Sequence, residues 1–340
     1  MSASKPTLIL KPAPQSSERI FSPVSRARLG DLFEVIDLEQ DDSTAAFDDA
    51  LPHAFAIVGQ PDLPTEALRR AASLKALINV EGNFFPNVDY PTAFRQGVRV
   101  LGCGTAYAQA VAEYALGLAL DLARGITRED RAFRRGEEGW DSASNIDAVL
   151  LRRAKVGLIG FGNLGKHLHQ LLQPFNAEIR VFDPWLPTSI LLDAGVIPST
   201  LDDVLTESRF VFVLATVTAE SQHLLNAAKL DLLQKDARLM VISRAAVVDF
   251  DALLERLRAG AFLASIDVWP VEPLPPDSAF RELENLVMSS HRAGGIPSAF
   301  LSIGEMVCDD LELMLQGLPP ARLQTAAPEL VGRYRSRPVG

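Results

Sequence analysis

Short apolar segments alternate with segments of helical spacing along most of the chain. The apolar runs fall at residues 7–10, 54–59, 74–80 and 98–102, and then at 155–160, 178–183, 209–215, 238–243, 262–269 and 285–290. Each run is apolar nearly throughout instead of alternating with polar residues, which is typical of parallel strands that are covered on both faces. Strands that alternate with helices in this way predict an α/β protein built on parallel sheets.

Four segments have the spacing of helices: residues 64–74, 106–126, 251–260 and 298–317. The second of them is rich in alanine and glycine, and small residues allow helices to approach closely. It is therefore expected between domains or at a subunit contact, with an ordinary core helix as the alternative. The last helix is stopped by Gly317 and by Pro319-Pro320, and it could return to pack on the first domain.

Length, charge and cysteine content narrow the class of protein. A chain of 340 residues with 48% hydrophobic residues has room for two domains with sizeable cores. Its formal net charge of −10 argues against binding to nucleic acid, which requires a basic face. Cys103 and Cys308 are too few for a disulfide framework, so a reducing cytoplasm is the simpler interpretation.

The sequence has neither the pattern of a signal peptide nor that of a membrane span. The N-terminal region holds an apolar run of only four residues, which is shorter than the core of a signal peptide. The most apolar segment, residues 106–123, is interrupted by Gln109, Glu113 and Asp121, which indicates a buried or interface helix. We therefore expect a cytoplasmic protein that does not bind membranes.

The first run of the second series leads into the sequence GFGNLG. Gly160, Gly162 and Gly165 follow an apolar strand and open a helix, and the next apolar run ends in Asp183. This context predicts a dinucleotide-binding turn, where the glycines allow the tight turn, the approach of a pyrophosphate and close helix packing. Asp183 would accept hydrogen bonds from the adenosine ribose and repel a 2′-phosphate, which favours NAD over NADP. A methyltransferase can share this fold and turn.

Three later runs end in polar residues. Arg244 follows one strand, Asp267 ends the next with Glu272 in the following turn, and His291 follows the third. Ligands of doubly wound sheets bind outside the carboxyl ends of the strands. An arginine, two acids and a histidine are therefore expected to meet where a nicotinamide would lie. A lone histidine at a strand end is usually structural, but His291 is expected beside Arg244, Asp267 and Glu272.

At these residues the chain resembles the D-isomer-specific 2-hydroxyacid dehydrogenases, the family of phosphoglycerate, glycerate, D-lactate and formate dehydrogenases. The arginine, acid and histidine motifs of the family appear as SRAAVVD, DVWPVEP and SSHRAGG. The resemblance implies two Rossmann-like doubly wound domains with a cleft between them. These are a flavodoxin-like substrate domain, residues 1–104 and 297–340, and a NAD-binding Rossmann domain, residues 105–296. It also implies NAD as the cofactor and a homodimer.

By this resemblance, Arg244 grips the substrate's carboxylate and carbonyl oxygen, His291 exchanges the proton, Glu272 orients His291, and Asp267 contacts the nicotinamide amide. Reduction of a 2-oxo acid needs a hydride and a proton at the developing alkoxide, and a carboxylate beside a histidine favours the imidazolium that supplies the proton. No metal site is predicted. The residues expected at the cofactor are Gly160, Gly162, Asn163, Leu164, Gly165, Asp183, Ala215, Thr216, Ile242, Ser243, Arg244, Asp267, His291 and Gly294.

The segment NVEGNFFPNVDY corresponds to the substrate-carboxylate loop of the family. Backbone N–H groups around Val80, Glu81 and Gly82 would face the substrate. Phosphoglycerate dehydrogenases typically place an arginine near the position of Asn79, whereas this loop holds Glu81 and no cation. A phosphorylated substrate is therefore expected to bind poorly.

Three motifs depart from the usual sequences of the family. Ser243-Arg244-Ala245 stands in place of Ala-Arg-Gly, Ser289-Ser290-His291 in place of Thr-Pro-His, and Leu214-Ala215-Thr216 in place of His-x-Pro. The four residues of catalytic type are all present, so an active enzyme remains the expectation. Phe84 and Phe85 of the substrate loop either line an apolar pocket or pack in the core.

The leading hypothesis is a NAD-dependent D-2-hydroxyacid dehydrogenase that works largely as a 2-oxoacid reductase. It leaves open whether the protein is specifically a phosphoglycerate dehydrogenase or a hydroxypyruvate or glyoxylate reductase. An alternative of another class is a NAD(H)-sensing protein like the dehydrogenase-related corepressors, which keep the fold and most of the site. Oxidation of NADH with a panel of 2-oxo acids separates the two classes.

Overall fold

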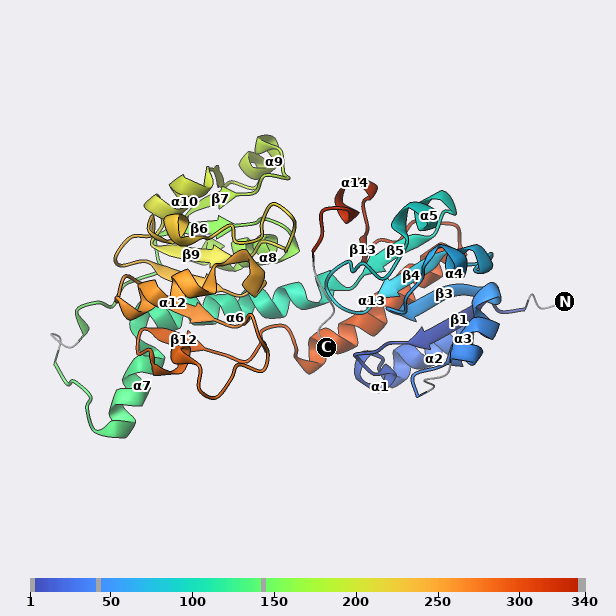
Figure 1. The fold of residues 1–340 in the computed structure, drawn as a ribbon, viewed down its shortest axis with the longest axis horizontal. Coiled ribbons are helices and arrows are strands. Elements are labelled where there is room, and N and C mark those ends of the chain that lie inside the picture. The colour runs from blue at the N-terminus through green and yellow to red at the C-terminus, as the bar shows by residue number, and fades with distance from the viewer. Residues whose placement is uncertain (1–3, 41–43, 142–144, 336–340) are drawn as a thin grey trace. The chain divides into compact units, whose positions relative to one another are not determined.

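The computed structural model describes residues 4–40, 44–141 and 145–335. They form two compact units, each built around its own sheet (Figure 1). The first unit consists of the residues up to Tyr107 and of those from Gly295 onward, and the second unit runs from Ala108 to Gly294.

The first unit holds a six-stranded sheet in the order β13-β5-β4-β3-β1-β2. Its strands are β1 (Thr7–Lys11), β2 (Glu34–Asp37), β3 (Ala54–Gly59), β4 (Ala76–Asn79), β5 (Arg99–Gly102) and β13 (Gln324–Thr325). The first five are parallel, and β13 is antiparallel to β5. In chain order the parallel strands lie 2-1-3-4-5, so the expected flavodoxin-like arrangement is confirmed.

Helices cover both faces of this sheet. They are α1 (Ser17–Ile20), α2 (Pro23–Leu32), α3 (Thr44–Ala50), α4 (Thr65–Arg70), α5 (Tyr90–Arg95), α13 (Pro297–Leu315) and α14 (Pro328–Val331). One buried cluster joins the sheet to α1, α2 and α13, and a second joins its other face to α3, α4 and α5. The last long helix, α13, contacts α1 and α2, so the C-terminal part of the chain does return to the first unit.

The second unit holds a seven-stranded, entirely parallel sheet in the order β12-β11-β10-β9-β6-β7-β8. Its strands are β6 (Lys155–Ile159), β7 (Glu178–Phe182), β8 (Ile197–Pro198), β9 (Phe210–Val213), β10 (Arg238–Val241), β11 (Leu263–Ile266) and β12 (Leu286–Met288). In chain order they lie 3-2-1-4-5-6-7. This is the Rossmann order with one further strand, which confirms the predicted fold of this domain.

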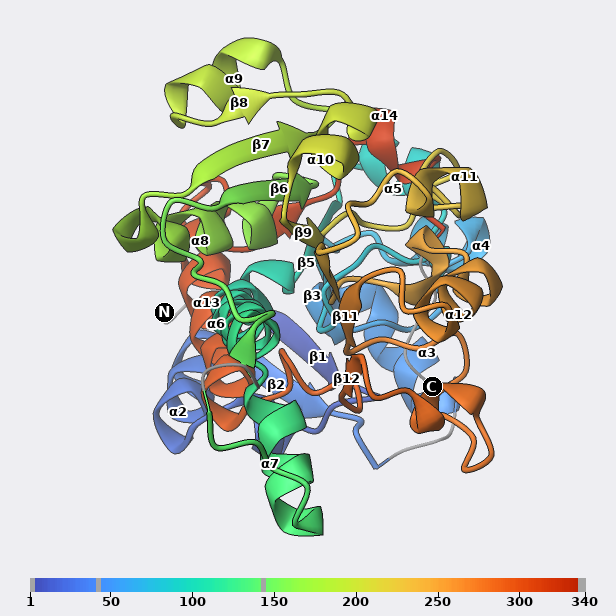
Figure 2. The same cartoon turned by 90° about the vertical axis from the view of Figure 1, so that its left-hand side faces the viewer.

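The helices of the second unit are α6 (Gly104–Arg124), α7 (Ile126–Arg135), α8 (Asn163–Leu172), α9 (Thr188–Asp193), α10 (Leu201–Glu207), α11 (Ala227–Leu230) and α12 (Phe250–Arg258). Figure 2 shows α6 and α8 on one face of the sheet and α10 and α12 on the other, and each pair belongs to a separate buried cluster. Three alanines of α6, Ala112, Ala115 and Ala119, are fully buried. One face of this helix is therefore an ordinary core face. Among the described residues, no helix is long and apolar enough to cross a membrane.

The apolar pattern does not predict β2. This strand lies at the edge of the six-stranded sheet. Its end residues, Glu34 and Asp37, are exposed, and the two apolar residues between them are only half buried. A strand with a single neighbour needs less apolar surface than a central one, so its sequence need not carry the continuous apolar run by which the central strands are found. The two-residue edge strands β8 and β13 also lie outside the predicted runs.

Candidate active site

Three adjacent strands bring the predicted chemical residues to one edge of the seven-stranded sheet. β10, β11 and β12 are neighbours and parallel, so their carboxyl ends lie side by side. Arg244 follows β10, Asp267 follows β11, and His291 follows β12. The structure therefore brings together these three residues, which the sequence places at separate strand ends.

His291 and Glu272 form a hydrogen-bonded pair. Nδ1 of His291 lies 2.7 Å from Oε2 of Glu272, and both side chains are 30% exposed. The other carboxylate oxygen, Oε1, accepts a hydrogen bond of 2.9 Å from the backbone N–H of Trp269. With Nδ1 donating to the carboxylate, Nε2 is the ring nitrogen that can exchange a proton with a ligand. A histidine held by an oriented carboxylate is the arrangement of a general acid and base.

The buried carboxylate of Asp267 holds the turn that carries His291 through hydrogen bonds. This carboxylate is 1% exposed. Its Oδ1 accepts from the backbone N–H of Arg292 (3.0 Å) and from the hydroxyl of Ser289, and its Oδ2 accepts from the backbone N–H of Ala293 (3.1 Å). The contact of Asp267 with a nicotinamide amide stays a prediction. Its observed partners show a further effect, which is to hold the SSHRA turn.

Two supports of this network, the side chain of Trp269 and the backbone of His291, are absent from the sequence prediction. The indole N–H of Trp269 donates to the backbone carbonyl of Ser289 (2.8 Å), which ties the turn of Glu272 to the turn of His291. The backbone of His291 has a positive φ of 48°, a conformation that few residues other than glycine adopt, and its N–H donates to the carbonyl of Asp267 (2.8 Å). The sequence gives little indication of these supports, because Trp269 looks like one more apolar residue at the end of the apolar run 262–269.

Arg244 lies at the start of a short 3-10 turn, Ala245–Val247. Its Nη1 donates to the backbone carbonyl of Ser243 (2.7 Å). The hydroxyl of Ser243 is buried and has no hydrogen-bond partner among the described residues. The guanidinium, with donors arranged as a fork, suits the planar carboxylate of a small acid.

The glycine turn lies at the carboxyl end of β6 and leads into α8. Gly160 has a φ of 101°, and a Cβ there would come within 3.0 Å of the backbone nitrogen of Ala215. A Cβ at Gly165 would come within 2.6 Å of the carbonyl oxygen of Gly160, so the turn requires both glycines. A Cβ at Gly162 would meet no protein atom within 4 Å. The turn thus leaves open space at the N-terminus of α8, which fits a dinucleotide pyrophosphate.

Asp183 follows β7, beside this turn. Its Oδ2 accepts from the backbone N–H of Phe161 (2.7 Å) and its Oδ1 from the backbone N–H of Trp185 (2.9 Å). The carboxylate therefore fastens the glycine turn to the end of the neighbouring strand. Its contact with an adenosine ribose stays a prediction, and the observed position is compatible with it.

The remaining predicted cofactor residues fall on the same sheet edge or at its margin. Asn163 and Leu164 open α8, Ala215 and Thr216 follow β9, Ile242 and Ser243 follow β10, and Gly294 ends the second unit. Around all described residues, no group of three or more histidine, cysteine, aspartate or glutamate side chains could hold a metal ion.

The predicted substrate loop lies in the first unit, after β4. The carbonyl of Val80 accepts from the Tyr107 hydroxyl (3.0 Å), and Oε2 of Glu81 accepts from Nε2 of Gln60 (3.1 Å). Phe84 and Phe85 are 4% and 2% exposed, which supports the packing role for them over a pocket lining. The sequence prediction missed Gln60, although a polar residue directly after a central strand was the available signal.

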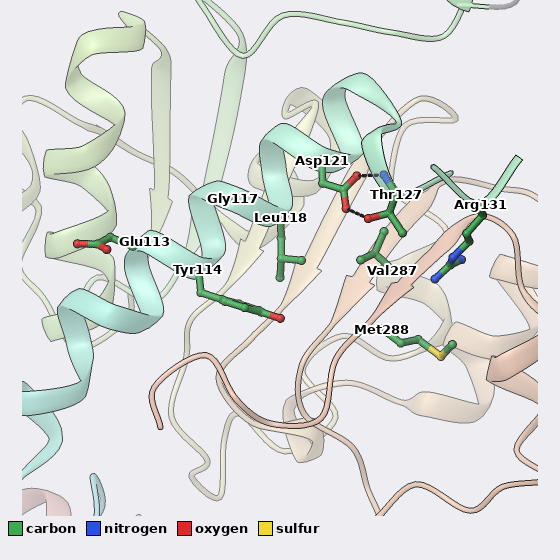
Figure 3. Close-up of a pocket in the computed structure, with 9 residues that line it drawn as sticks. All are labelled: Glu113, Tyr114, Gly117, Leu118, Asp121, Thr127, Arg131, Val287 and Met288. Atoms are coloured by element: carbon green, nitrogen blue, oxygen red, sulfur yellow. Dashed lines mark hydrogen bonds between the residues drawn. The ribbon is translucent and has the colours of Figure 1, made fainter. Parts of the chain in front are cut away.

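An open cavity of about 470 Å³ lies elsewhere in the second unit, beside α6, α7 and β12 (Figure 3). Asp121 there accepts from the backbone N–H and the hydroxyl of Thr127, which fixes α7 to the end of α6. The nine residues that line this cavity include none of the predicted catalytic, cofactor or substrate residues.

Comparisons with known proteins agree with this geometry. Residues 116–293 match the family model described as "D-isomer specific 2-hydroxyacid dehydrogenase, NAD binding domain". A glyoxylate reductase from Thermofilum pendens is 30% identical over 76% of this chain and 77% of its own. A D-3-phosphoglycerate dehydrogenase from Synechocystis is 27% identical over 84% of this chain, but over only 51% of its own length.

A solved structure gives a closer match. The crystal structure of a phosphoglycerate oxidoreductase from Rhizobium etli is 43% identical in sequence, with a TM-score of 0.86 over 95% of this chain and 99% of that one. Its sheet arrangement and that of this chain are therefore comparable over nearly the whole of both proteins.

Proposed function

Because the chain belongs to the D-isomer-specific 2-hydroxyacid dehydrogenase family, we propose that it reduces unphosphorylated 2-oxo acids with NADH and uses His291 as the acid and base. The class of reaction follows from the family: the protein is a NAD-dependent oxidoreductase that acts on the CH–OH group of a D-2-hydroxy acid. The observation that carries the residue assignment is the 2.7 Å hydrogen bond between His291 and Glu272 at the carboxyl edge of the Rossmann sheet.

The chemistry divides between cofactor and protein. A bound nicotinamide supplies the hydride to C2 of the 2-oxo acid, or accepts it in the reverse direction. His291 gives a proton from Nε2 to the oxygen on C2 as the C–O double bond becomes single, and takes it back in oxidation. Glu272 keeps the ring oriented by accepting from Nδ1.

Arg244 is proposed to bind the substrate's carboxylate and carbonyl oxygen. Its fork of N–H donors matches the two oxygens of a carboxylate. Interaction with the carbonyl oxygen also stabilises the negative charge that develops there during reduction. Backbone N–H groups around Val80, Glu81 and Gly82 in the first unit are proposed as further donors to the substrate.

Asp183 supports a preference for NAD(H) over NADP(H). A 2′-phosphate beside this carboxylate would be repelled, and no shift of the turn can relieve this easily because both carboxylate oxygens are held by backbone N–H groups. The open space at Gly162 is where the pyrophosphate is proposed to lie, with the N-terminus of α8 facing it.

The preference for an unphosphorylated substrate rests on the charges of the first unit. The buried acid Glu81 lies in the substrate loop. Arg99 begins β5 and so lies at the amino edge of the sheet, whereas the loop follows the carboxyl end of β4. Arg95 donates to Thr92 within its own helix (2.7 Å). Neither arginine therefore supports a phosphate site at the loop.

A phosphorylated 2-hydroxy acid is the second candidate substrate. It is favoured by the names of two similar proteins, the D-3-phosphoglycerate dehydrogenase from Synechocystis and the phosphoglycerate oxidoreductase from Rhizobium etli. The two candidates differ in a measurable way, since only a phosphate site requires a cation near the substrate loop.

We also propose a cytoplasmic homodimer. Five large apolar side chains between residues 126 and 150 are exposed by 59–89%: Ile126, Phe133, Trp140, Ile146 and Leu150. Helix α7 has no buried residue and extends away from the sheet of its unit (Figure 2). Apolar surface concentrated in this way is typical of a protein interface. Two free, buried cysteines are consistent with a reducing compartment.

The direct test is oxidation of NADH by the purified protein with 2-oxo acids offered one at a time. The panel holds glyoxylate, hydroxypyruvate, 3-phosphohydroxypyruvate and branched and aromatic 2-oxo acids. Turnover with unphosphorylated acids supports the proposal, and a tenfold preference for 3-phosphohydroxypyruvate establishes the second candidate instead. Tight NADH binding without turnover of any 2-oxo acid would contradict both and favour a NAD(H)-sensing protein.

A further inference from the structure

The substrate loop lies against the start of helix α6 within the first unit. The backbone N–H of Cys103, directly before α6, donates to the carbonyl of Asn79 (3.1 Å) and to that of Glu81 (3.3 Å). A Cβ added to Gly104 would lie 2.8 Å from the carbonyl oxygen of Gly82, so the two backbones approach more closely than a side chain allows. The first turn of α6 therefore supports this loop.

One side chain of α6 holds the loop at its buried end. The hydroxyl of Tyr107, in the first turn of the helix, donates to the carbonyl of Val80 over 3.0 Å. Val80 is 0% exposed, whereas Gly82 is partly exposed. The hydrogen bond thus anchors the loop where it leaves the core, directly before the part of the loop that is accessible.

The anchored carbonyl belongs to the peptide bond between Val80 and Glu81, which is trans. In a planar trans peptide the carbonyl oxygen and the following N–H point to opposite sides. A carbonyl directed toward Tyr107 therefore directs the N–H of Glu81 away from α6. Because a buried carbonyl that loses its partner is unfavourable, loss of the Tyr107 hydroxyl should turn this peptide and the residues that follow it.

The side chain of Tyr107 is itself held by its surroundings. Its ring meets that of Phe300 edge to face, with the ring centroids 5.9 Å apart. The guanidinium carbon of Arg19 lies over the Phe300 ring, 3.8 Å from its centroid. Burial raises the pKa of the Tyr107 phenol, so the hydroxyl keeps its proton and can donate. The hydrogen bond to Val80 therefore comes from a donor whose position is fixed.

A second tyrosine holds the far end of the same segment. The hydroxyl of Tyr90, the first residue of α5, donates to the carbonyl of Phe85 over 2.7 Å. Both of these residues are buried. This bond has the same chemistry as that of Tyr107, but it lies outside residues 80–82. The two tyrosines therefore allow the stability of the segment to be separated from an effect on the substrate.

We propose that Tyr107 is a positioning residue for substrate binding: its hydroxyl holds the Val80 carbonyl and so keeps the backbone N–H groups of residues 80–82 aligned for the carboxylate of a 2-oxo acid. The inference rests on the proposed function, because it takes this loop to bind the substrate. Tyr107 takes no part in hydride or proton transfer. It acts on binding alone, so its loss should raise KM and leave kcat nearly unchanged.

Tyr107→Phe tests this, because it removes only the hydroxyl and keeps the ring against Phe300. We expect KM for 2-oxo acids to rise about fivefold, the size of effect typical of one hydrogen bond. The values of kcat and of the dissociation constant of NADH should change less than about twofold. The rise in KM should be the same for glyoxylate and hydroxypyruvate, since the two acids share the carboxylate and differ in the side chain.

Tyr90→Phe is the matched control. It removes a hydrogen bond of the same kind at a more buried residue, so it should lower the melting temperature at least as much as Tyr107→Phe does and leave KM unchanged. Tyr114→Phe, in α6 at the cavity of Figure 3, should change neither quantity. Tyr107→Leu, which removes the ring and the hydroxyl together, should raise KM at least as much as Tyr107→Phe.

Failure of this inference and failure of the proposed function give different results. If the wild type reduces 2-oxo acids but Tyr107→Phe raises KM no more than Tyr90→Phe does, the hydroxyl serves stability only and the reductase stands. A fall in kcat at unchanged KM, or a rise in KM for only one of the two acids, would also overturn the positioning role. If the wild type reduces no 2-oxo acid, the proposed function fails and this inference fails with it.

Discussion

Nδ1 of His291 lies 2.7 Å from Oε2 of Glu272, and the second oxygen of that carboxylate accepts the backbone N–H of Trp269. Both hydrogen bonds together fix the carboxylate, and the carboxylate fixes the imidazole. The ring therefore presents Nε2 in one orientation without a ligand having to arrange it. Such preorganisation is what general acid–base catalysis requires of its proton donor.

Replacing His291 by asparagine should remove the proton donor while sparing the cofactor site. We expect kcat for 2-oxo acid reduction to fall by ~10²–10⁴, with the dissociation constant of NADH changed little. Stopped-flow kinetics and fluorescence titration with NADH measure the two quantities. A variant that keeps most of its activity would show that SSHRAGG is only the end of a strand.

Glu272→Gln should lower the rate of proton transfer. A neutral amide oxygen accepts from Nδ1 more weakly than a carboxylate does, so Nε2 of His291 is held less firmly toward the substrate. We expect kcat for reduction to fall while the dissociation constant of NADH changes little. Steady-state kinetics and fluorescence titration measure the two quantities, and an unchanged kcat would rule out the pair as the proton relay.

Asp183→Ala should reduce the preference for NADH over NADPH. The wild type is expected to prefer NADH over NADPH by at least ~10-fold in kcat/KM, about 1.4 kcal/mol. The variant loses the repulsion of the 2′-phosphate, but it also loses the acceptor that holds the N–H of Phe161, so KM for NADH should rise as well. Asp193→Ala, at the end of α9, serves as the control. Equal use of both cofactors by the wild type would overturn the assignment.

The exposed segment after α6 allows a test of the homodimer. Trp140→Glu places a charge where the side chain is 84% exposed, and a charge at the centre of an apolar interface disfavours association. Analytical ultracentrifugation should show twice the mass of the chain for wild type and a shift toward the single chain for the variant. Ile190→Glu, at an apolar residue of α9 that is 43% exposed, should remain a dimer. A monomeric wild type would contradict the proposal.

The buried thiols predict loss of stability at high pH. Burial raises the pKa of the Cys308 thiol to about 11 and raises that of Cys103 as well. The folded protein then binds these protons more tightly than the unfolded chain, so the stabilisation is full below the ordinary thiol pKa and is lost as the pH rises toward the folded value. The free energy of unfolding from urea titrations should fall between about pH 9 and pH 11, by at most about 1.4 kcal/mol per pH unit for one thiol. Cys308→Ser should fall less steeply, and equal slopes would contradict this origin.

The sequence predicts the central strands and the edge strand β12 well, but it does not predict the edge strands β2, β8 and β13. Strands such as β6 and β9 are covered on both faces, so burial forces a continuous apolar run that can be seen without a structure. An edge strand such as β2 has no such requirement. The order of the strands followed from the resemblance to a known family and not from the apolar runs alone.

The same difference holds for the proposed catalytic site. Arg244, Glu272 and His291 are the residues proposed to carry the chemistry, and their residue types at or after strand ends are visible in the sequence. The roles of Asp267 and Trp269 in holding the turns arise from hydrogen bonds to backbone groups, which any acid or indole can make and which therefore leave no distinctive motif. Gln60 was missed for a related reason, since an amide after a strand is common and its hydrogen bond to Glu81 is visible only in the structure.

The order in which the units can be completed follows from the path of the chain. The second unit is a single continuous stretch, whereas the first unit is interrupted by it. Arg28 of α2 pairs with Asp309 of α13 over 281 residues of sequence (2.6 Å). During synthesis from the N-terminus, the sheet of the first unit must wait without α13 until the whole second unit has left the ribosome. One face of the sheet that is made first is therefore the last to be covered.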